Sequence, residues 1–281
     1  MAVIPGRTVL AAVTMLGLVA FAGCGKDSKK PNAASASSSS FSSSAAPTST
    51  SSFSASSSTE SAPPASSGPC SGAAVPGSAV NVTSAHGDFD GDGSNDTLTV
   101  YGTGSTSQPS PYHVHMDLGG GNGSVDAAIV DAATDSAQVV KALGGAEISA
   151  SAGLPPDGSG VEAFVAIGSG ASDTLVGVFQ LTSCTLNRLT GPQGNAPSNF
   201  PIGGSVTHLD GLRCDGSAGG QRLVVMSATS DDGFTYQTKE TRLEVAGGHF
   251  TPDPPVTDTI DAQDPRLQAF SSLDCQGVQA P

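Results

Sequence analysis

Three segments of the chain run from a loop rich in Asp and Gly into a short apolar stretch. They begin at Asp90, Asp157 and Asp215. Aligned at Asp96, Glu162 and Gln221, the segments are 66 and 59 residues apart. Self-similarity at a regular step indicates a repeated structural unit, and steps of this length suit a four-stranded sheet with long loops. The repeat therefore predicts a fold built from β-strand units.

The rest of residues 70–281 agrees with an all-β fold. Runs rich in Val, Thr, Ile, Phe and Leu recur between clusters of Gly, Pro, Asn and Asp, which is typical of short strands joined by turns. We expect strands at residues 79–83, 97–101, 112–117, 125–130, 163–167, 174–181, 223–228, 234–239 and 242–245. The glycine-rich residues 119–123 predict a hairpin loop, because no strand-turn-helix context supports a phosphate-binding loop. Helix signals are confined to residues 132–143 and 265–273.

Residues 33–68 divide the chain. Half of these 36 residues are Ser, and they show no apolar period of a helix or a strand. Such a segment has too little apolar surface to offset the entropy of ordering, so we expect a flexible linker. A linker of this length and composition typically spans roughly 30–36 Å. The folded domain is therefore expected at residues 70–281.

The N-terminus has the pattern of an export signal. Arg7 gives a positive start, and the 15 residues from Val9 to Gly23 are uncharged and mostly apolar. This run is shorter than the roughly 20 residues of a membrane-spanning helix, and it favours a secretory signal peptide. The sequence Phe-Ala-Gly-Cys, which ends at Cys24, resembles a bacterial lipobox. The resemblance implies cleavage before Cys24 and acylation (palmitate) of that residue.

The expected organisation is therefore a lipoprotein signal peptide at 1–23, a lipidated Cys24 with a Ser-rich linker at 24–69, and the all-β domain at 70–281. The protein is expected at the extracytoplasmic face of the cell membrane, held by its lipid anchor. The alternative is an ordinary secreted protein whose first cysteine is incidental.

Charge excludes some partners. The chain carries a formal net charge of −14. Residues 70–281 hold seven basic and 23 acidic residues, which gives this part a formal charge of −16. Nucleic acids and anionic lipid headgroups require a basic face, so neither is an expected partner. An acidic domain of this kind attracts cations instead.

The first Asp-Gly loop has the spacing of a calcium loop. Carboxylates occupy its positions 1, 3, 5 and 9, with Gly at position 6 and Ser at position 7. Calcium takes roughly six to eight oxygen ligands, and four carboxylates in nine residues repel one another without a cation. The alternative is a solvated acidic turn. We predict one calcium site, formed by Asp88, Asp90, Asp92, the Ser94 carbonyl and Asp96.

Position 12 of the first loop departs from the EF-hand pattern, and so do the other two Asp-Gly loops. Thr99 stands where an EF-hand loop has its final Glu, so Asp96 is expected to supply the late carboxylate. The loops at Asp157 and Asp215 keep too few carboxylates. We expect those two loops to be metal-free, with hydrogen-bonded turns in place of the ion.

Residues 86–98, His-Gly-Asp-Phe-Asp-Gly-Asp-Gly-Ser-Asn-Asp-Thr-Leu, resemble the Asp-rich calcium loop of the FG-GAP/VCBS repeat family. Residues 164–172 and 207–214 extend the likeness to a group of actinobacterial lipoproteins with such repeats. The resemblance implies antiparallel sheets in propeller-like repeats. Three repeats are fewer than an ordinary closed propeller has, so the expected fold is a partial propeller or a sandwich.

Four cysteines remain after Cys24. An even number in an exported domain indicates two disulfides rather than free thiols, with three possible pairings. Cys70 and Cys275 lie near the two ends of the domain, so pairing them would hold its ends together. We therefore predict the pairs Cys70–Cys275 and Cys184–Cys214.

No catalytic residues stand out. His113 and His115 alternate on an expected strand and share one face, but the sequence offers no third metal ligand nearby. No Ser lies in a Gly-x-Ser-x-Gly context that follows a strand and opens a helix. The sequence therefore favours a non-enzymatic binding or structural module for an extracytoplasmic protein or glycan. The alternative is an extracytoplasmic hydrolase that acts on cell-wall or extracellular glycan.

Overall fold

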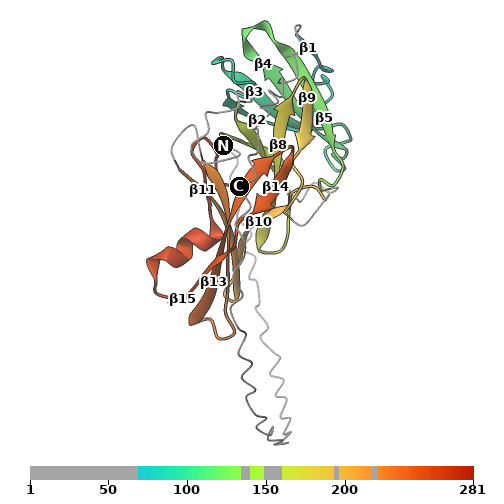
Figure 1. Cartoon of the computed structure of the whole chain (residues 1–281). Coiled ribbons are helices and arrows are strands. Elements are labelled where there is room, and N and C mark those ends of the chain that lie inside the picture. Colours follow the sequence, from blue (N-terminus) through green and yellow to red (C-terminus); the bar gives the residue numbers. More distant parts are fainter. Residues whose placement is uncertain (1–68, 134–139, 149–159, 193–195, 217–220) are drawn as a thin grey trace, which may run out of the picture. The chain divides into compact units, whose positions relative to one another are not determined.

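The computed structural model describes residues 69–133, 140–148, 160–192, 196–216 and 221–281 (Figure 1). These residues form sixteen β-strands and two short 3-10 helices, so the all-β prediction is confirmed. Among the described residues, none belongs to a helix with the length and apolar character that crossing a membrane requires.

The first sheet has five strands, drawn in blue to green in Figure 1. Its spatial order is β1-β5-β4-β3-β2, and all neighbours are antiparallel except β1 and β5. The predicted hairpin loop at residues 119–123 is confirmed, and the short helix η1 forms part of it. The elements are β1 (Cys70–Ser71), β2 (Val80–Gly87), β3 (Asp96–Gly102), β4 (Tyr112–Leu118), η1 (Gly119–Gly121) and β5 (Gly123–Ile129).

The second sheet has eleven strands. Its main path runs β14-β13-β12-β11-β10-β8-β7-β6, while β15, β16 and β9 pair with β13, β11 and β8. Its strands are β6 (Lys141–Ala146), β7 (Glu162–Ser169), β8 (Asp173–Thr182), β9 (Thr185–Arg188), β10 (Phe200–Ser205), β11 (His208–Asp215), β12 (Arg222–Thr229), β13 (Thr235–Ala246), β14 (His249–Pro252), β15 (Val256–Asp261) and β16 (Leu273–Asp274). The second short helix is η2 (Pro265–Ser271).

Each Asp-Gly segment leads into the second strand of a four-stranded antiparallel meander. The three meanders are β2–β5, β6–β9 and β11–β14. Strand β10 pairs with both β8 and β11, so the second and third meanders belong to one continuous sheet. Neither sheet closes into a barrel. The propeller arrangement itself stays a prediction.

Strand alternation places the core between the sheets. Leu98 and Met116 of the first sheet are fully buried, and they belong to one apolar cluster with Val165 and Phe179 of the second sheet. A second cluster lies within the larger sheet around Phe164, and a third is formed where η2 packs on β12.

Two disulfides are present, as expected, but the predicted pairing is wrong. The pairs are Cys70–Cys184 and Cys214–Cys275, with Cα–Cα distances of 5.3 and 4.8 Å. Cys70 lies on β1, which adds to the first sheet beside β5. Cys275 follows β16, which pairs with the strand that carries Cys214. The two ends of the domain therefore join different sheets. The N-terminal end is bonded to Cys184, between β8 and β9, and the C-terminal end is bonded to Cys214 of β11.

Of three further secondary-structure predictions, two need correction and the helix signal at residues 265–273 is confirmed in part. Residues 132–143 were expected to be helical, but β6 begins at Lys141, and residues 134–139 lie outside the described part. Residues 265–273 give a 3-10 helix, η2, which begins where the Asp264 side chain accepts a hydrogen bond from the Arg266 N–H. The strands expected at 234–239 and 242–245 form one strand, β13.

Candidate functional site

The loop between β2 and β3 is shaped by its own aspartates. Asp88 Oδ2 accepts a hydrogen bond from the Gly93 N–H at 3.0 Å. In the same way, Asp90 Oδ1 accepts from the Asp92 N–H at 3.2 Å, and Asp92 Oδ1 accepts from the Ser94 N–H at 2.6 Å. The hydrogen bond from the Ser94 backbone lowers the pKa of Asp92. These short-range bonds curl the loop without any helix.

Asp96 ties this loop to a second turn. It is the first residue of β3 and is completely buried. Its Oδ2 atom accepts hydrogen bonds from the N–H groups of Phe89 at 2.6 Å and Asp90 at 3.3 Å, and its Oδ1 atom accepts from Gly119 at 2.6 Å. Burial raises the pKa of Asp96, although the Gly119 and Phe89 N–H groups oppose the rise. A buried carboxylate with these properties would be stabilised by a nearby cation.

Three of the predicted ligands come together. Single carboxylate oxygens of Asp88, Asp90 and Asp96 all lie within 4.8 Å of one another. The Oδ1 atom of Asp88 is buried and has no hydrogen-bond partner. A buried carboxylate oxygen is costly when nothing compensates its charge, and a hard cation would compensate it. The Asp92 carboxylate lies outside this group.

Asn122 is a member of this site that the sequence analysis missed. Its Nδ2 atom donates hydrogen bonds to Asp90 Oδ2 and Asp92 Oδ2, both at 2.8 Å. Rotation of the amide by half a turn would present Oδ1, an oxygen that can bind a cation, at the same place. Asn122 follows η1, and its approach to the loop depends on the pairing of β3, β4 and β5, for which the sequence carries no local signal.

A second polar cluster lies on the face of the first sheet that carries His113 and His115. The His115 side chain is only 1% exposed, and its Nε2 atom lies 3.1 Å from Asp117 Oδ1. Its Nδ1 atom has no hydrogen-bond partner and lies 3.7 Å from Asp126 Oδ2. The prediction that both imidazole rings share one face is therefore confirmed.

Asp126 of β5 joins the two histidines to Tyr101 of β3. Its Oδ1 atom lies 2.8 Å from His113 Nδ1, and its Oδ2 atom accepts a hydrogen bond from the Tyr101 hydroxyl at 2.8 Å. The Tyr101 and His113 rings stack with their centroids 5.2 Å apart. Burial, together with the hydrogen bond to Asp126 and its charge, raises the pKa of Tyr101 to about 12.

The members of this His–Asp–Tyr cluster are joined by hydrogen bonds at Asp126. Within the part of the chain that the structure describes, only Asp88, Asp90 and Asp96 bring three metal-ligating side chains within 4.8 Å of one another. The sequence offers no third metal ligand near the two histidines, because Asp126 reaches them only through the pairing of β4 with β5.

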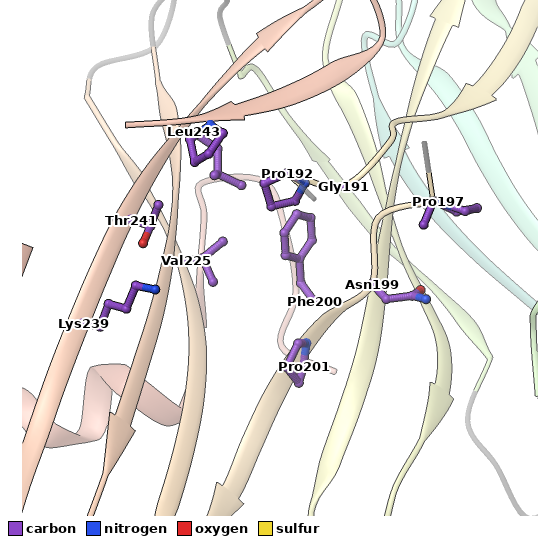
Figure 2. A pocket seen from close by; sticks show the side chains of 12 residues that line it. Gly191, Pro192, Pro197, Asn199, Phe200, Pro201, Val225, Lys239, Thr241 and Leu243 are labelled. Atoms are coloured by element: carbon purple, nitrogen blue, oxygen red, sulfur yellow. The ribbon is translucent and has the colours of Figure 1, made fainter. Parts of the chain in front are cut away.

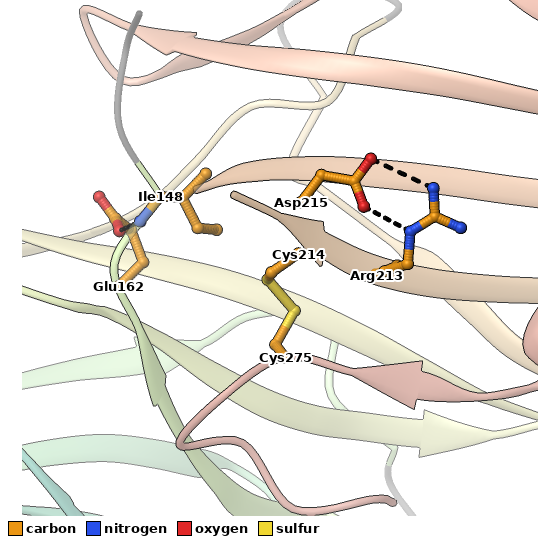
Figure 3. The surroundings of a disulfide bond; sticks show 6 residues. All are labelled: Ile148, Glu162, Arg213, Cys214, Asp215 and Cys275. Atoms are coloured by element: carbon orange, nitrogen blue, oxygen red, sulfur yellow. Dashed lines mark hydrogen bonds and ion pairs between the residues drawn. A yellow bond between two sulfur atoms is a disulfide. The ribbon is translucent and has the colours of Figure 1, made fainter. Parts of the chain in front are cut away.

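The aligned positions of the three Asp-Gly segments are alike in burial. Asp96, Glu162 and Gln221 have exposures of 0%, 3% and 5%. Glu162 Oε2 accepts a hydrogen bond from the Ile148 N–H at 2.8 Å, beside the Cys214–Cys275 disulfide (Figure 3). Each segment therefore places a buried polar side chain at or next to the start of its strand.

The third segment neutralises its aspartate with arginine. Asp215 Oδ2 accepts a hydrogen bond from Arg213 Nη2 at 3.1 Å (Figure 3). The same oxygen lies 3.6 Å from Arg242 Nη2. The hydrogen bond from Arg213 is the main reason why the pKa of Asp215 is lowered. Asp157, which was expected in the other metal-free loop, lies outside the described residues.

Cys24 and the Ser-rich linker also lie outside the described residues, so the lipid anchor stays a prediction. Comparison of the chain with protein-family models, curated proteins and solved structures finds no match. What the domain does has therefore to be inferred from its own residues.

Proposed function

We propose that residues 70–281 form the extracytoplasmic domain of a lipid-anchored protein and act as a non-enzymatic binding or structural module. In this proposal calcium holds the loop at residues 88–96. The observation that carries the calcium site is the buried, unpaired Oδ1 atom of Asp88 beside the carboxylates of Asp90 and Asp96. The anchor and its tether are supported by the lipobox at Cys24 and the Ser-rich linker.

The donor set suits calcium. Three carboxylates converge, and the Asp92 side chain and Ser94 carbonyl of the same loop are further oxygens that the spacing predicts. The Asn122 amide can supply another if it reverses. Calcium accepts such a varied oxygen set because its coordination is flexible, whereas magnesium requires a stricter octahedral arrangement. Bound calcium would offset the mutual repulsion of the carboxylates and the cost of burying Asp96.

Calcium titration of the full chain tests this site. The chain carries Cys24→Ala to remove acylation, and thermal unfolding is followed beside isothermal titration. An ion that binds only the folded state stabilises it by about 2.7 kcal/mol at a hundredfold excess over Kd. We expect one site, lost in Asp90→Asn and kept in the matched control Asp157→Asn. An unfolding temperature that changes neither with calcium nor with chelator would refute the calcium site.

Fractionation tests the anchor separately. We expect the wild-type protein in the membrane fraction of the producing bacterium and the Cys24→Ala variant in the soluble extracytoplasmic fraction, because an acylated cysteine anchors stably through several chains. Equal recovery of both proteins with the membranes would exclude lipidation at Cys24.

The proposed partner is an extracytoplasmic protein or glycan. A pull-down from the native envelope, with calcium and with chelator, is expected to recover a partner whose retention depends on loop 88–96. The second candidate function is glycan hydrolysis. It is favoured only by the partly buried acid–base groups around Asp126, since carboxylates are the usual catalysts of that reaction. Release of reducing sugar from cell-wall glycan that disappears in Asp126→Asn would replace the non-enzymatic proposal with this one.

A further inference from the structure

A cavity of about 530 Å³ opens on one face of the second sheet (Figure 2). Val225 of β12 and Thr241 of β13 are directly paired, so their side chains point to the same face and line one side of it. Phe200 and Pro201 of β10 line the other side. This volume lies within the range of pockets that hold small organic molecules.

Backbone pairing fixes the walls of the cavity. The segment after β9 runs along the turn before β14, where the Thr190 N–H donates to the Gly248 carbonyl at 3.0 Å and the Phe250 N–H donates to the Thr190 carbonyl at 3.1 Å. The Phe200 and Phe250 rings meet edge to face with centroids 5.3 Å apart. Residues 193–195 lie outside the described part and take no part in the inference.

The lining is apolar and poor in backbone donors. Phe200, Val225 and Leu243 contribute hydrocarbon surface. Four of the other lining residues are prolines, which have no backbone N–H and a fixed φ angle. They are Pro192, Pro197, Pro201 and Pro252. Such walls favour the apolar body of a ligand over a polyhydroxylated one.

Lys239 brings the single charge to this cavity. Its side chain extends toward the space beside Val225 and Thr241 (Figure 2). All five arginines of the described part form ion pairs with Asp or Glu, whereas Lys239 forms none there. An unpaired ammonium group is unusual in a domain with a formal charge of −16, and it is suited to a negatively charged ligand.

The neighbours of Lys239 on the same face are hydroxyl groups. Ser227 and Thr257 are paired with it across the adjacent strands, and Thr241 follows it on its own strand. Asp210 is paired with Ser227 on the next strand and is the nearest carboxylate across the sheet on this face. Its Oδ2 atom lies 2.6 Å from His208 Nε2, so it already has a partner. The positions paired with Lys239 therefore offer no carboxylate that would compete with a ligand.

We propose that this cavity binds a small amphipathic anion: an apolar chain or ring that carries one carboxylate or phosphate. The anionic group meets the Lys239 ammonium and the Thr241 hydroxyl, and the apolar body packs against Phe200, Val225 and Leu243. A ligand with only one anionic group suits the site because the acidic domain repels polyanions. This site goes beyond the calcium-stabilised module and involves none of the residues of loop 88–96.

Titration with matched ten-carbon probes tests the site. The probes are decanoate, decyl phosphate, the neutral decanol and cationic decyltrimethylammonium, all below their aggregation limits. The protein is the full chain with Cys24→Ala, and the readout is the NMR signals of the Val225 and Leu243 methyl groups. These methyl signals report binding at the cavity only, so probe molecules that bind the apolar N-terminal segment do not contribute to the measured affinity. Chelator is present throughout, so the result does not depend on calcium.

We expect decanoate or decyl phosphate to bind about tenfold more tightly than decanol, and the cation not to bind, because one hydrogen bond to a charged group is worth about this ratio. The stronger of the two anions identifies the preferred head group. Lys239→Met should bring the anions to the affinity of decanol, while Lys141→Met, which changes the other lysine of the described residues, should leave the preference intact.

Val225→Trp fills the cavity and should weaken the binding of every probe, followed in this variant by the Leu243 methyl signals alone, with unchanged signals elsewhere in the sheet as the check on folding. The proposal is overturned if the two methyl signals respond to no probe, or if wild-type protein binds decanol as tightly as both anions. It is also overturned if Lys141→Met removes the preference as fully as Lys239→Met does.

Discussion

The Oδ1 atom of Asp96 accepts a hydrogen bond at 2.6 Å from the N–H of Gly119, which lies 23 residues further along the chain, so one carboxylate joins two turns. Its other oxygen accepts from Phe89 and Asp90 within the first turn. The sequence predicts Asp96 as a late metal ligand. In the structure its carboxylate holds the loop through three backbone N–H groups.

Replacing Asp96 should therefore destabilise the domain even without metal. Asp96→Ala leaves three backbone N–H groups without their acceptor, and a buried donor left unsatisfied costs about 1–3 kcal/mol. We expect a loss on the order of 3 kcal/mol or more in the free energy of unfolding, measured with urea in the presence of chelator. Asp92→Ala, at an exposed position of the same loop, should cost less than about 1 kcal/mol. Equal losses would contradict the role of Asp96 as acceptor for these three N–H groups.

A second prediction concerns the C-terminal segment, which closes against β6. The Gln279 N–H donates to the Leu143 carbonyl at 2.8 Å, and Gly144 pairs with Val278. Gly144 has a φ angle of +128°, and a Cβ atom there would lie 2.2 Å from the Gly277 carbonyl oxygen. Gly144→Ala therefore requires backbone displacement as well as an unfavourable φ, and we expect it to cost about 3 kcal/mol or more.

The matched control for Gly144 is Gly121. Its φ angle is +89°, but a Cβ atom there would have no neighbour within 4 Å. Gly121→Ala should therefore cost only the strain of the left-handed conformation, about 1–2 kcal/mol. Thermal or urea unfolding of both variants checks the difference. If the two substitutions are equally costly, the close approach of Gly277 to β6 is not present in solution.

Continuous apolar runs made part of the fold predictable. Strands β3, β4, β7, β8 and β12 lie where the sequence predicts them, because each carries a run of buried Val, Leu, Ile, Phe or Met. Strand β11 escaped prediction since its sequence contains Asp, Gly and Arg. Its Arg213 side chain is held by Asp215 and by Glu240 of β13. A strand whose polar residues pair with residues of neighbouring strands lacks the apolar pattern by which strands are predicted from sequence.

The candidate site was predictable only within one loop. The spacing of Asp88, Asp90 and Asp96 is a local property, and the structure brings these three together. Asn122 and Asp126 could not be predicted, because their positions depend on how β5 pairs with β4 and thus on the register of the whole sheet. The disulfide pairing failed for the same reason, since nothing in the sequence assigns β1 and β16 to different sheets.

The observed disulfides give a third prediction. Cys70–Cys184 and Cys214–Cys275 span 114 and 61 residues. Because the entropy of loop closure varies with the logarithm of loop length, the chain-entropy treatment assigns about 4–5 kcal/mol to each, with a difference below about 1 kcal/mol. Replacing either pair by alanine should therefore lower the free energy of unfolding by similar amounts. Peptide mapping under non-reducing conditions checks the pairing, and a Cys70–Cys275 peptide would contradict it.

The last prediction concerns Tyr101, whose hydroxyl donates to Asp126. Burial and Asp126 raise the pKa of Tyr101 from 10.0 to about 12. A group whose pKa is raised by folding contributes stability that is complete below its unfolded pKa and is lost as the pH rises through its folded pKa. The free energy of unfolding should therefore fall between pH 10 and pH 12 more steeply in the wild type than in Tyr101→Phe. At neutral pH the substitution should cost about 1 kcal/mol, the net value of one hydrogen bond.

Absorbance of the ionised tyrosine ring can follow this group directly, because the chain has three tyrosines and no tryptophan. We expect a late titration step near pH 12 in the folded protein, and this step should be missing from Tyr101→Phe. Asp126→Asn removes the carboxylate charge but keeps an acceptor, so the late step should move toward lower pH without reaching the ordinary tyrosine pKa, since burial is the larger cause. A late step that persists in Tyr101→Phe would assign the raised pKa to another tyrosine and remove Asp126 as its cause.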